Sequence, residues 1–186
     1  MTEIPLQQRL KALPALENGD LLGQPVMTAL GALPPELAAG VTVTEIDPAL
    51  ADTAAFCARY GVLAEESANC VVVAGRRGEV ATLAACVVLA TTRADVNGLV
   101  RRTLGAKKIS FASMDVAVSA SGMEYGGITP IGLPVDWPIL IDRAVVDAGD
   151  VVVGSGLRRS KIVVAGSTLA ALPNATVLDG LGLPPQ

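Results

Sequence analysis

With 186 residues, the chain is long enough for one domain with a single substantial core, or for one domain with a short extension. Hydrophobic residues make up 51% of it, which excludes a disordered chain, and the net charge of −4 excludes binding of nucleic acid by bulk electrostatic attraction. The apolar residues are mainly Ala, Val and Leu. This composition is typical of a layered fold, in which Val-rich strands lie under Ala- and Leu-rich helices.

The first forty residues differ from the rest, because five prolines separate short apolar helical patterns there. We expect residues 1–40 to form an N-terminal helical extension and residues 41–186 to form the domain. Asp52 or Thr53 is the predicted cap of one helix and Asp95 that of another, and Gly61 and Gly105 follow these helices. In chain order, the sequence predicts a helix over Val26 to Leu33, a strand over Val41 to Ile46, a helix over Thr53 to Tyr60, strands over Cys70 to Ala74 and Val80 to Leu89, a helix from Asp95 to Leu104, a strand over Ile109 to Ala112, a helix over Met114 to Ser121, strands over Ile139 to Asp142, Val151 to Val153 and Ile162 to Val164, and a helix over Thr168 to Leu172 capped by Ser167.

Several predicted strands follow one another with only a turn between them. Gly75 to Gly78, for example, is expected to form the hairpin turn between the strands ending at Ala74 and beginning at Val80. A purely parallel sheet would require a helical crossover between each pair of strands. The sequence therefore predicts an α+β fold in which helices pack around a mixed central β-sheet.

Membrane, secretory and disulfide-rich classes find no support in the sequence. The longest nearly uncharged stretch, Val80 to Thr92, is too short to cross a membrane, because a spanning helix needs roughly 20 apolar residues. The N-terminus has no basic segment ahead of an apolar run, so no secretory signal is predicted. Cys57, Cys70 and Cys86 are widely spaced and odd in number, which favours reduced thiols. We therefore expect a cytoplasmic protein.

The inventory of reactive side chains excludes much familiar chemistry. The chain has no histidine, which excludes His-based triads, His-coordinated zinc and the commonest general base. The cysteines lack CxxC spacing, so no metal site is expected. The run Gly154-Ser155-Gly156 is more typical of a tight turn than of a phosphate-binding loop. Cys70 is either a buried small hydrophobic residue, which is the commoner role, or a nucleophile whose pKa a nearby arginine lowers.

Two short basic clusters stand out from the acidic composition. Each could contact a phosphate, although a solvated helix or loop face is the commoner role of such clusters. They are Arg101-Arg102 with Lys107-Lys108, and Arg158-Arg159 with Lys161.

The loop from Gly126 to Pro134 is the remaining candidate for a functional site. Gly126 and Gly127 allow backbone conformations and close approaches that other residues cannot make. Pro130 and Pro134 remove amide donors and stiffen the loop. Such a loop can present backbone N–H groups to a carbonyl or a developing oxyanion. The alternative, which the residues alone favour, is a rigid surface turn between a helix and a strand.

The loop lies within the segment Ser121 to Gly132, SGMEYGGITPIG, which resembles the TGxxxGGxxPxG segment of the YbaK/EbsC family of aminoacyl-tRNA editing domains. The editing insertion of bacterial prolyl-tRNA synthetases has a similar segment. Leu104 to Lys108 is similar to the family's LGxKK, Arg93-Ala94-Asp95 to its RxD, and Val152 to Gly156 to its late glycine turn. The resemblance extends roughly from Val41 to Pro173, and the first forty residues lie outside it.

The resemblance implies a central sheet that is partly barrel-like, and an enzyme that hydrolyses the ester between a small, wrongly attached amino acid and the 3′ end of a tRNA. The backbone of the GxxxP loop would hold the substrate carbonyl and orient water, and a ribose hydroxyl of the substrate would assist. Gly126, Gly127, Ile128, Thr129 and Pro130 are therefore the candidate catalytic residues. The resemblance implies no metal ion and no organic cofactor.

This sequence departs from the family pattern at Asn69. The family commonly has a lysine at this point, in a strand pattern like KTLLV, whereas Asn forms hydrogen bonds but carries no charge. We expect Asn69 to contact the substrate, and Arg93 or a residue of the Arg158-Arg159 pair could supply the missing charge. The further candidate substrate-binding residues are Thr92, Arg93, Ser155 and Arg158.

Three functions are consistent with the sequence. The first is a free-standing aminoacyl-tRNA deacylase whose partner is the 3′ end of an aminoacyl-tRNA. The second is a non-catalytic module that binds aminoacyl-tRNA or a small ligand and lost turnover with the family lysine. The third is an interaction protein that docks on an aminoacyl-tRNA synthetase through residues 1–40.

Overall fold

The computed structural model describes residues 4–185 of the chain. Its strands match most of the predicted ones to within one or two residues, and four short strands were not predicted: β1, β5, β10 and β11. In chain order the strands are β1 (Leu13–Pro14), β2 (Thr42–Glu45), β3 (Ala68–Arg77), β4 (Val80–Leu89), β5 (Arg93–Ala94), β6 (Lys108–Phe111), β7 (Ile139–Asp142), β8 (Asp150–Gly154), β9 (Ser160–Ala165), β10 (Ala175–Leu178) and β11 (Gly182–Leu183).

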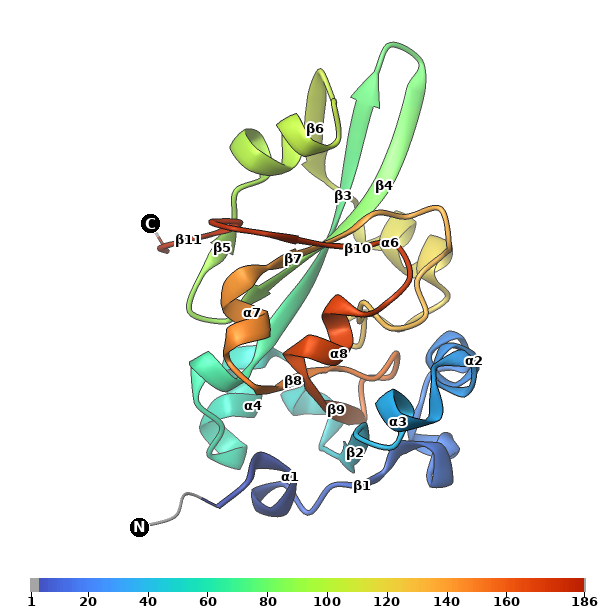
Figure 1. Ribbon diagram of the computed structural model, residues 1–186, viewed down its shortest axis with the longest axis vertical. Helices are drawn as coiled ribbons and strands as arrows, with labels where there is room; N and C mark the ends of the chain where they lie inside the picture. The colour runs from blue at the N-terminus through green and yellow to red at the C-terminus, as the bar shows by residue number, and fades with distance from the viewer. Residues whose placement is uncertain (1–3, 186) are drawn as a thin grey trace.

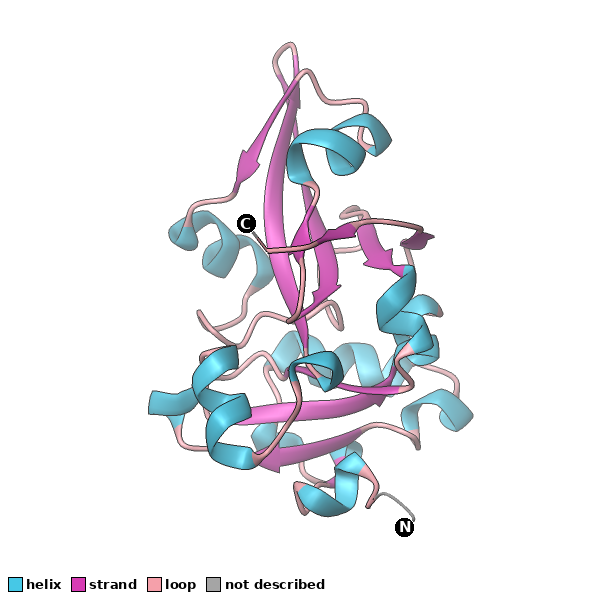
Figure 2. Cartoon of the chain, turned by 90° about the vertical axis from the view of Figure 1, so that its left-hand side faces the viewer, coloured by secondary structure: helices cyan, strands magenta, loops and turns pink. Residues whose placement is uncertain are grey.

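The described strands form three sheets. The largest has the order β10-β7-β4-β3-β6 and stands upright in Figure 1. A four-stranded sheet, β1-β2-β9-β8, lies below it, and its strands run across the direction of β3 and β4 in Figure 2. The third sheet pairs only β5 with β11. All three sheets of the described chain are open, so the fold is α+β as predicted, and the partly barrel-like sheet that the resemblance implied does not close into a barrel.

The five-stranded sheet is built on the long hairpin of β3 and β4. These strands pair antiparallel over ten residues each, while β7 pairs parallel with β4, so the sheet is mixed as predicted. The predicted hairpin turn was wrong in its bounds. Gly75 to Arg77 continue the pairing with β4, and Gly75 and Arg76 pair with β6 as well, which leaves only Gly78 and Glu79 in the turn.

The two large sheets meet where β3 begins. Ser67, directly before β3, forms a parallel bridge to Val152 in β8. The first residues of β3 therefore lie against the middle of β8, and the four-stranded sheet supports the lower end of the hairpin (Figure 1).

The helices are short and lie around the sheets. Asp52 caps its helix as predicted, because its carboxylate accepts hydrogen bonds from the N–H groups of Ala54 and Ala55. Asp95 also acts as a cap, although the segment that it caps begins as a π-helix. The predicted Ser167 cap was wrong, because α8 already begins at Gly166 and Ser167 lies inside it. The helices are α1 (Leu6–Arg9), α2 (Gln24–Ala32), α3 (Pro35–Ala38), α4 (Thr53–Tyr60), a π-helix (Val96–Val100), α5 (Arg101–Thr103), α6 (Met114–Ser121), α7 (Arg143–Asp147) and α8 (Gly166–Ala170), with 3-10 turns at Ala15–Glu17, Gly19–Leu21, Pro48–Leu50 and Ala64–Glu66.

The N-terminal segment contributes to the main hydrophobic core. Leu22, Val26 and Leu30 are buried in the same cluster as Val43 and Ile162 of the four-stranded sheet. The predicted boundary after residue 40 therefore falls within one continuous core, and the segment's separability stays a prediction. None of the helices described in the structure is long and apolar enough to cross a membrane.

Two substitutions in α2 test this integration. Leu30 is fully buried, so Leu30→Ala should lower the free energy of unfolding by about 2–5 kcal/mol. Met27 lies on the exposed side of the same helix, so Met27→Ala should cost about 1 kcal/mol or less. Urea unfolding followed by the fluorescence of Trp137, the one tryptophan and a member of the same core, measures both. Equal costs for the two variants would contradict an integral role for the segment.

Candidate functional site

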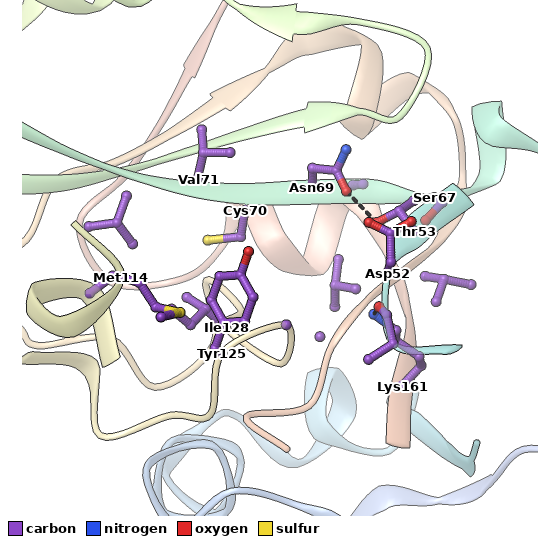
Figure 3. A pocket seen from close by; sticks show the side chains of 18 of the residues that line it. Asp52, Thr53, Ser67, Asn69, Cys70, Val71, Met114, Tyr125, Ile128 and Lys161 are labelled. Carbon is purple, nitrogen blue, oxygen red and sulfur yellow. Dashed lines mark hydrogen bonds between the residues drawn. The ribbon is translucent and has the colours of Figure 1, made fainter. Parts of the chain in front are cut away.

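A cleft of about 580 Å³ opens where the two large sheets meet (Figure 3). One wall is the start of β3, and the opposite wall includes the loop that follows α6. The N-terminus of α4 and two strands of the four-stranded sheet complete the lining. Among the predicted site residues, Asn69, Gly126 and Ile128 line this cleft.

Asn69 is held by a hydrogen bond from α4. The Thr53 hydroxyl donates to Asn69 Oδ1 over 2.7 Å. Successive strand residues point to opposite faces, so the Cys70 thiol faces Tyr125 while the Asn69 side chain points away from it (Figure 3). Asn69 thus lines the end of the cleft next to α4, beside Thr53.

The glycine loop is fixed by its neighbours on both sides. The Gly127 N–H donates to the Glu124 carbonyl over 2.9 Å, and the Gly127 carbonyl accepts from the Gly156 N–H over 2.7 Å. Within residues 4–185, the N–H groups of Gly126 and Ile128 have no acceptor. Two unpaired backbone donors therefore belong to residues that line the cleft.

Three of the candidate residues lie behind the cleft. Thr129 and Pro130 are buried, and the Thr129 hydroxyl has no hydrogen-bond partner in the described chain. Ser155 is also buried; its hydroxyl lies 2.7 Å from that of Ser160 and accepts from the Leu157 N–H. These residues support the loop from within the protein and do not line the cleft.

Arg158 holds the loop from outside. Its guanidinium donates to the Tyr125 carbonyl over 2.9 Å and to the Pro48 carbonyl over 3.1 Å. Gly126 has φ of 81°, and a Cβ there would lie 2.6 Å from Arg158 Nη1, so glycine permits this contact. Arg158 therefore fixes the position of the loop and does not line the cleft.

The structure does not bring Thr92 and Arg93 to the cleft. The chain turns after β4, where the Thr92 hydroxyl donates to the Leu89 carbonyl over 3.0 Å. Arg93 then pairs with Leu183 in the two-stranded sheet. Both residues were predicted to bind substrate, but after β4 the chain runs toward β11 and neither residue lines the cleft.

Lys161 also lines this cleft, although it was not among the predicted site residues. Its side chain is only 7% exposed, and its ammonium donates to the Ala51 carbonyl over 2.9 Å. The ammonium also lies 5.7 Å from the centre of the Phe56 ring. Burial lowers the pKa of Lys161 from its ordinary value, and the nearby Asp52 carboxylate opposes that shift. An ammonium has three N–H donors, and the described residues accept from one of them.

The sequence did contain a signal for Lys161. We interpreted it as part of a basic cluster with Arg158 and Arg159, yet the apolar run Ile162 to Val164 follows it directly. A charged residue that continues a buried strand is rarely a solvated one, because buried charges need partners or a function.

Cys70 lines the cleft, but its environment disfavours a nucleophile. Burial of the thiol raises the pKa of Cys70 far above its ordinary value, so the thiol is protonated at neutral pH. Cys70 is half-buried and packs against the main core, so the interpretation as a small hydrophobic residue is the better one. Among residues 4–185, no three His, Cys, Asp or Glu side chains form a group that could hold a metal ion.

The N-terminal segment packs against the back of the site. The Gly23 N–H donates to the Ser155 carbonyl over 2.8 Å, and the Ser160 hydroxyl donates to the Leu21 carbonyl over 2.7 Å. Gly132 has φ of 89°, and a Cβ there would lie 2.5 Å from the Pro25 carbonyl oxygen. The segment therefore supports both the glycine loop and the β8–β9 turn.

Comparison with known families defines the class of protein. Residues 47–172 match the aminoacyl-tRNA editing domain family. The match spans more than half of the chain, so this protein belongs to that family, the YbaK family, as the resemblance of residues 121–132 predicted.

Solved structures share the fold. A protein assigned as a trans-editing enzyme for prolyl-tRNA synthetase is 22% identical, with a TM-score of 0.68 over 85% of this chain and 97% of that one. A protein of unassigned function is 18% identical, with a TM-score of 0.70 over 84% and 96% of the two chains. A scaffold used for computational epitope grafting is 21% identical, with a TM-score of 0.69 over 84% and 95%. These likenesses establish the mixed α+β architecture.

The packing of Gly127 can be tested by two glycine substitutions. A Cβ at Gly127 would lie 2.6 Å from the Leu157 backbone, so Gly127→Ala should lower the free energy of unfolding by about 1–3 kcal/mol. Gly31 lies in α2 with open space around it, so Gly31→Ala should raise that free energy by about 0.5–1 kcal/mol. Thermal and urea unfolding measure both changes. A neutral Gly127→Ala would contradict the close packing.

Proposed function

We propose that this protein is an aminoacyl-tRNA deacylase that acts in trans on tRNA carrying a small, wrongly attached amino acid. The observation that carries the proposal is the cleft, which is lined by Gly126 and Ile128, whose N–H groups have no acceptor within residues 4–185, and by the buried Lys161. Membership of the editing-domain family supports the same reaction. A cytoplasmic location accompanies the proposal, because charged tRNA is used there.

The loop amides stabilise the oxygen of the ester carbonyl during the reaction. The ester carbonyl oxygen accepts hydrogen bonds from the Gly126 and Ile128 N–H groups, which strengthen as negative charge develops on that oxygen. Water adds to the carbonyl carbon, and the bond to the terminal ribose oxygen then breaks. The neighbouring ribose hydroxyl relays the proton from water to the leaving oxygen, so the products are the free amino acid and a tRNA with free hydroxyls. This route needs no protein base, in keeping with a chain that has no histidine.

Gly127, Thr129 and Pro130 act on this reaction through the loop. Gly127 uses both of its backbone groups to hold the loop in place, and Pro130 restricts its backbone. They are positioning residues in this proposal, whereas Gly126 and Ile128 contact the substrate.

Lys161 supplies the charge that Asn69 lacks. It reaches the cleft from β9, whereas the family lysine would lie on β3 at Asn69. Two ammonium donors to which residues 4–185 offer no acceptor can hold an anionic or carbonyl oxygen of the substrate, and such charge-assisted bonds are about twice as strong as neutral ones. The Asn69 amide then adds a neutral contact.

Selection by size follows from the walls of the cleft. Ala68, Val72, Ala117 and Val152 line it with small aliphatic side chains, and Met114 adds an adaptable one. A difference of one methyl group is worth only about 1–3 kcal/mol in such a pocket. The proposal is therefore a second sieve for small amino acids, acting after aminoacylation.

A binding module without turnover is the second candidate, and the replacement of the family lysine by Asn69 favours it. Incubation of the pure protein with tRNAs mischarged with Ala, Ser or Cys separates the two. We expect loss of the ester linkage faster than in buffer, followed as release of labelled amino acid. Binding of the same tRNAs without ester loss would establish the second candidate instead. Docking on a synthetase through residues 1–40 would appear as capture of the synthetase by the full chain.

Lys161→Met tests the role of the ammonium. Loss of a charge-assisted contact should lower kcat/KM about 10- to 100-fold. Replacing a buried charge by an apolar side chain of similar volume should leave stability at neutral pH unchanged or raise it. Lys11→Met, at an exposed position, is the matched control and should retain full activity.

The pH dependence of stability gives a second readout of Lys161. Its pKa is lowered in the folded state, so the unfolded chain binds more protons between that lowered pKa and about 10.5. The wild type should therefore gain stability relative to Lys161→Met as pH rises through this window. A stability difference independent of pH, measured by urea unfolding, would show that the ammonium is not desolvated.

A further inference from the structure

A groove continues from the cleft along the hairpin of β3 and β4. On β3, Cys70 and Val72 line the cleft, while Ala74 and Arg76 line the groove. Alternate residues of a strand point to the same face, so cleft and groove share one face of the sheet. Phe111 lines both of them and is 63% exposed. Figure 1 shows β6 beside the projecting hairpin, and Arg76 and Ala81 of the groove lie close to the hairpin's turn.

Two like charges lie directly opposite each other in this groove. Arg76 of β3 pairs with Lys108 of β6 in the antiparallel register, and both side chains are exposed. Such directly opposed residues have Cβ atoms about 4.5–5.5 Å apart, and like charges there are destabilising. The ion pairs in the described part of the chain are Arg9 with Glu66 and Arg143 with Asp179, so neither cation of the groove has a carboxylate partner. An anion bound between them would remove this repulsion.

The hairpin of β3 and β4, together with the adjoining residues 101–108, is basic, in contrast to the rest of the molecule, and is called the arm below. The chain has a net charge of −4, yet six of its 14 Lys and Arg residues lie exposed on or beside this hairpin. An asymmetric charge distribution steers a polyanion toward its positive region. The six residues are Arg76, Arg77, Arg101, Arg102, Lys107 and Lys108.

We infer that the groove lined by Arg76 and Lys108 binds the phosphate backbone of the RNA whose aminoacylated 3′ end enters the cleft. Arg76 and Lys108 contact phosphates, and such contacts tolerate any sequence. The inference rests on the proposed function, because it assumes that the cleft receives the end of a tRNA.

The experiment compares two substrates in the double variant Arg76→Gln/Lys108→Gln. On full-length aminoacyl-tRNA, KM should rise about 10-fold with little change in kcat, because phosphate contacts act on binding. On an aminoacylated adenosine, which has no adjoining phosphates, both constants should equal those of the wild type. Binding of an uncharged tRNA transcript, followed by fluorescence anisotropy, should weaken, and the slope of log Kd against log salt should fall by about two.

Two controls exclude misfolding and unspecific charge effects. Arg143→Gln removes an exposed arginine on α7, outside the arm, and should leave the tRNA affinity unchanged. The double variant should unfold at the same temperature as the wild type or higher, because it relieves the repulsion between Arg76 and Lys108.

The outcomes separate this inference from the proposed function. Wild-type tRNA affinity and salt slope in the double variant would overturn the inference, as would an equal loss of activity on both substrates. Hydrolysis of the aminoacylated adenosine by a wild type that binds no tRNA would also overturn it, while leaving the esterase chemistry intact. Groove-dependent tRNA binding without any hydrolysis would support the inference and contradict the deacylase proposal. Loss of synthetase capture alone would assign the groove to a protein partner and overturn it.

Discussion

The cleft depends on the contact between the glycine loop and the turn from β8 to β9. Gly127 gives its carbonyl to the Gly156 N–H and packs against the Leu157 backbone with no room for a Cβ. The Gly127 N–H donates to the Glu124 carbonyl within the loop, and the N–H groups of Gly126 and Ile128 on either side have no partner in the described chain. A rigid loop with unpaired donors is what stabilisation of a developing oxyanion requires, since such donors need no reorganisation during the reaction.

Support for this contact comes from a part of the chain outside the matched family range. Residues 47–172 match the family, whereas Leu21 and Gly23 form hydrogen bonds to Ser160 and Ser155 behind the loop. The same segment buries Leu30 in the main core. The N-terminal residues therefore contribute both to stability and to the geometry of the site.

Three charged residues near the cleft and the groove reduce the stability of the fold. A buried ammonium at Lys161 and the opposed cations Arg76 and Lys108 both disfavour folding, because the first is desolvated and the others repel each other. Both lie on the path that an RNA end would take, from the groove into the cleft. Local arrangements that oppose stability are expected at functional sites, where the ligand supplies the missing partner.

The sequence by itself determined the element types, the mixed sheet and the family, because strand and helix periodicities, caps such as Asp52 and the GxxxP loop are local patterns. Only the tertiary structure decided which residues meet at the site. Thr92 and Arg93 leave β4 toward β11, and Arg158 holds the outside of the loop. Lys161 enters the cleft because β9 pairs with β8 there, a long-range pairing that no local pattern specifies. The position of a charge in the cleft therefore depends on sheet register, which forms only when the whole chain folds.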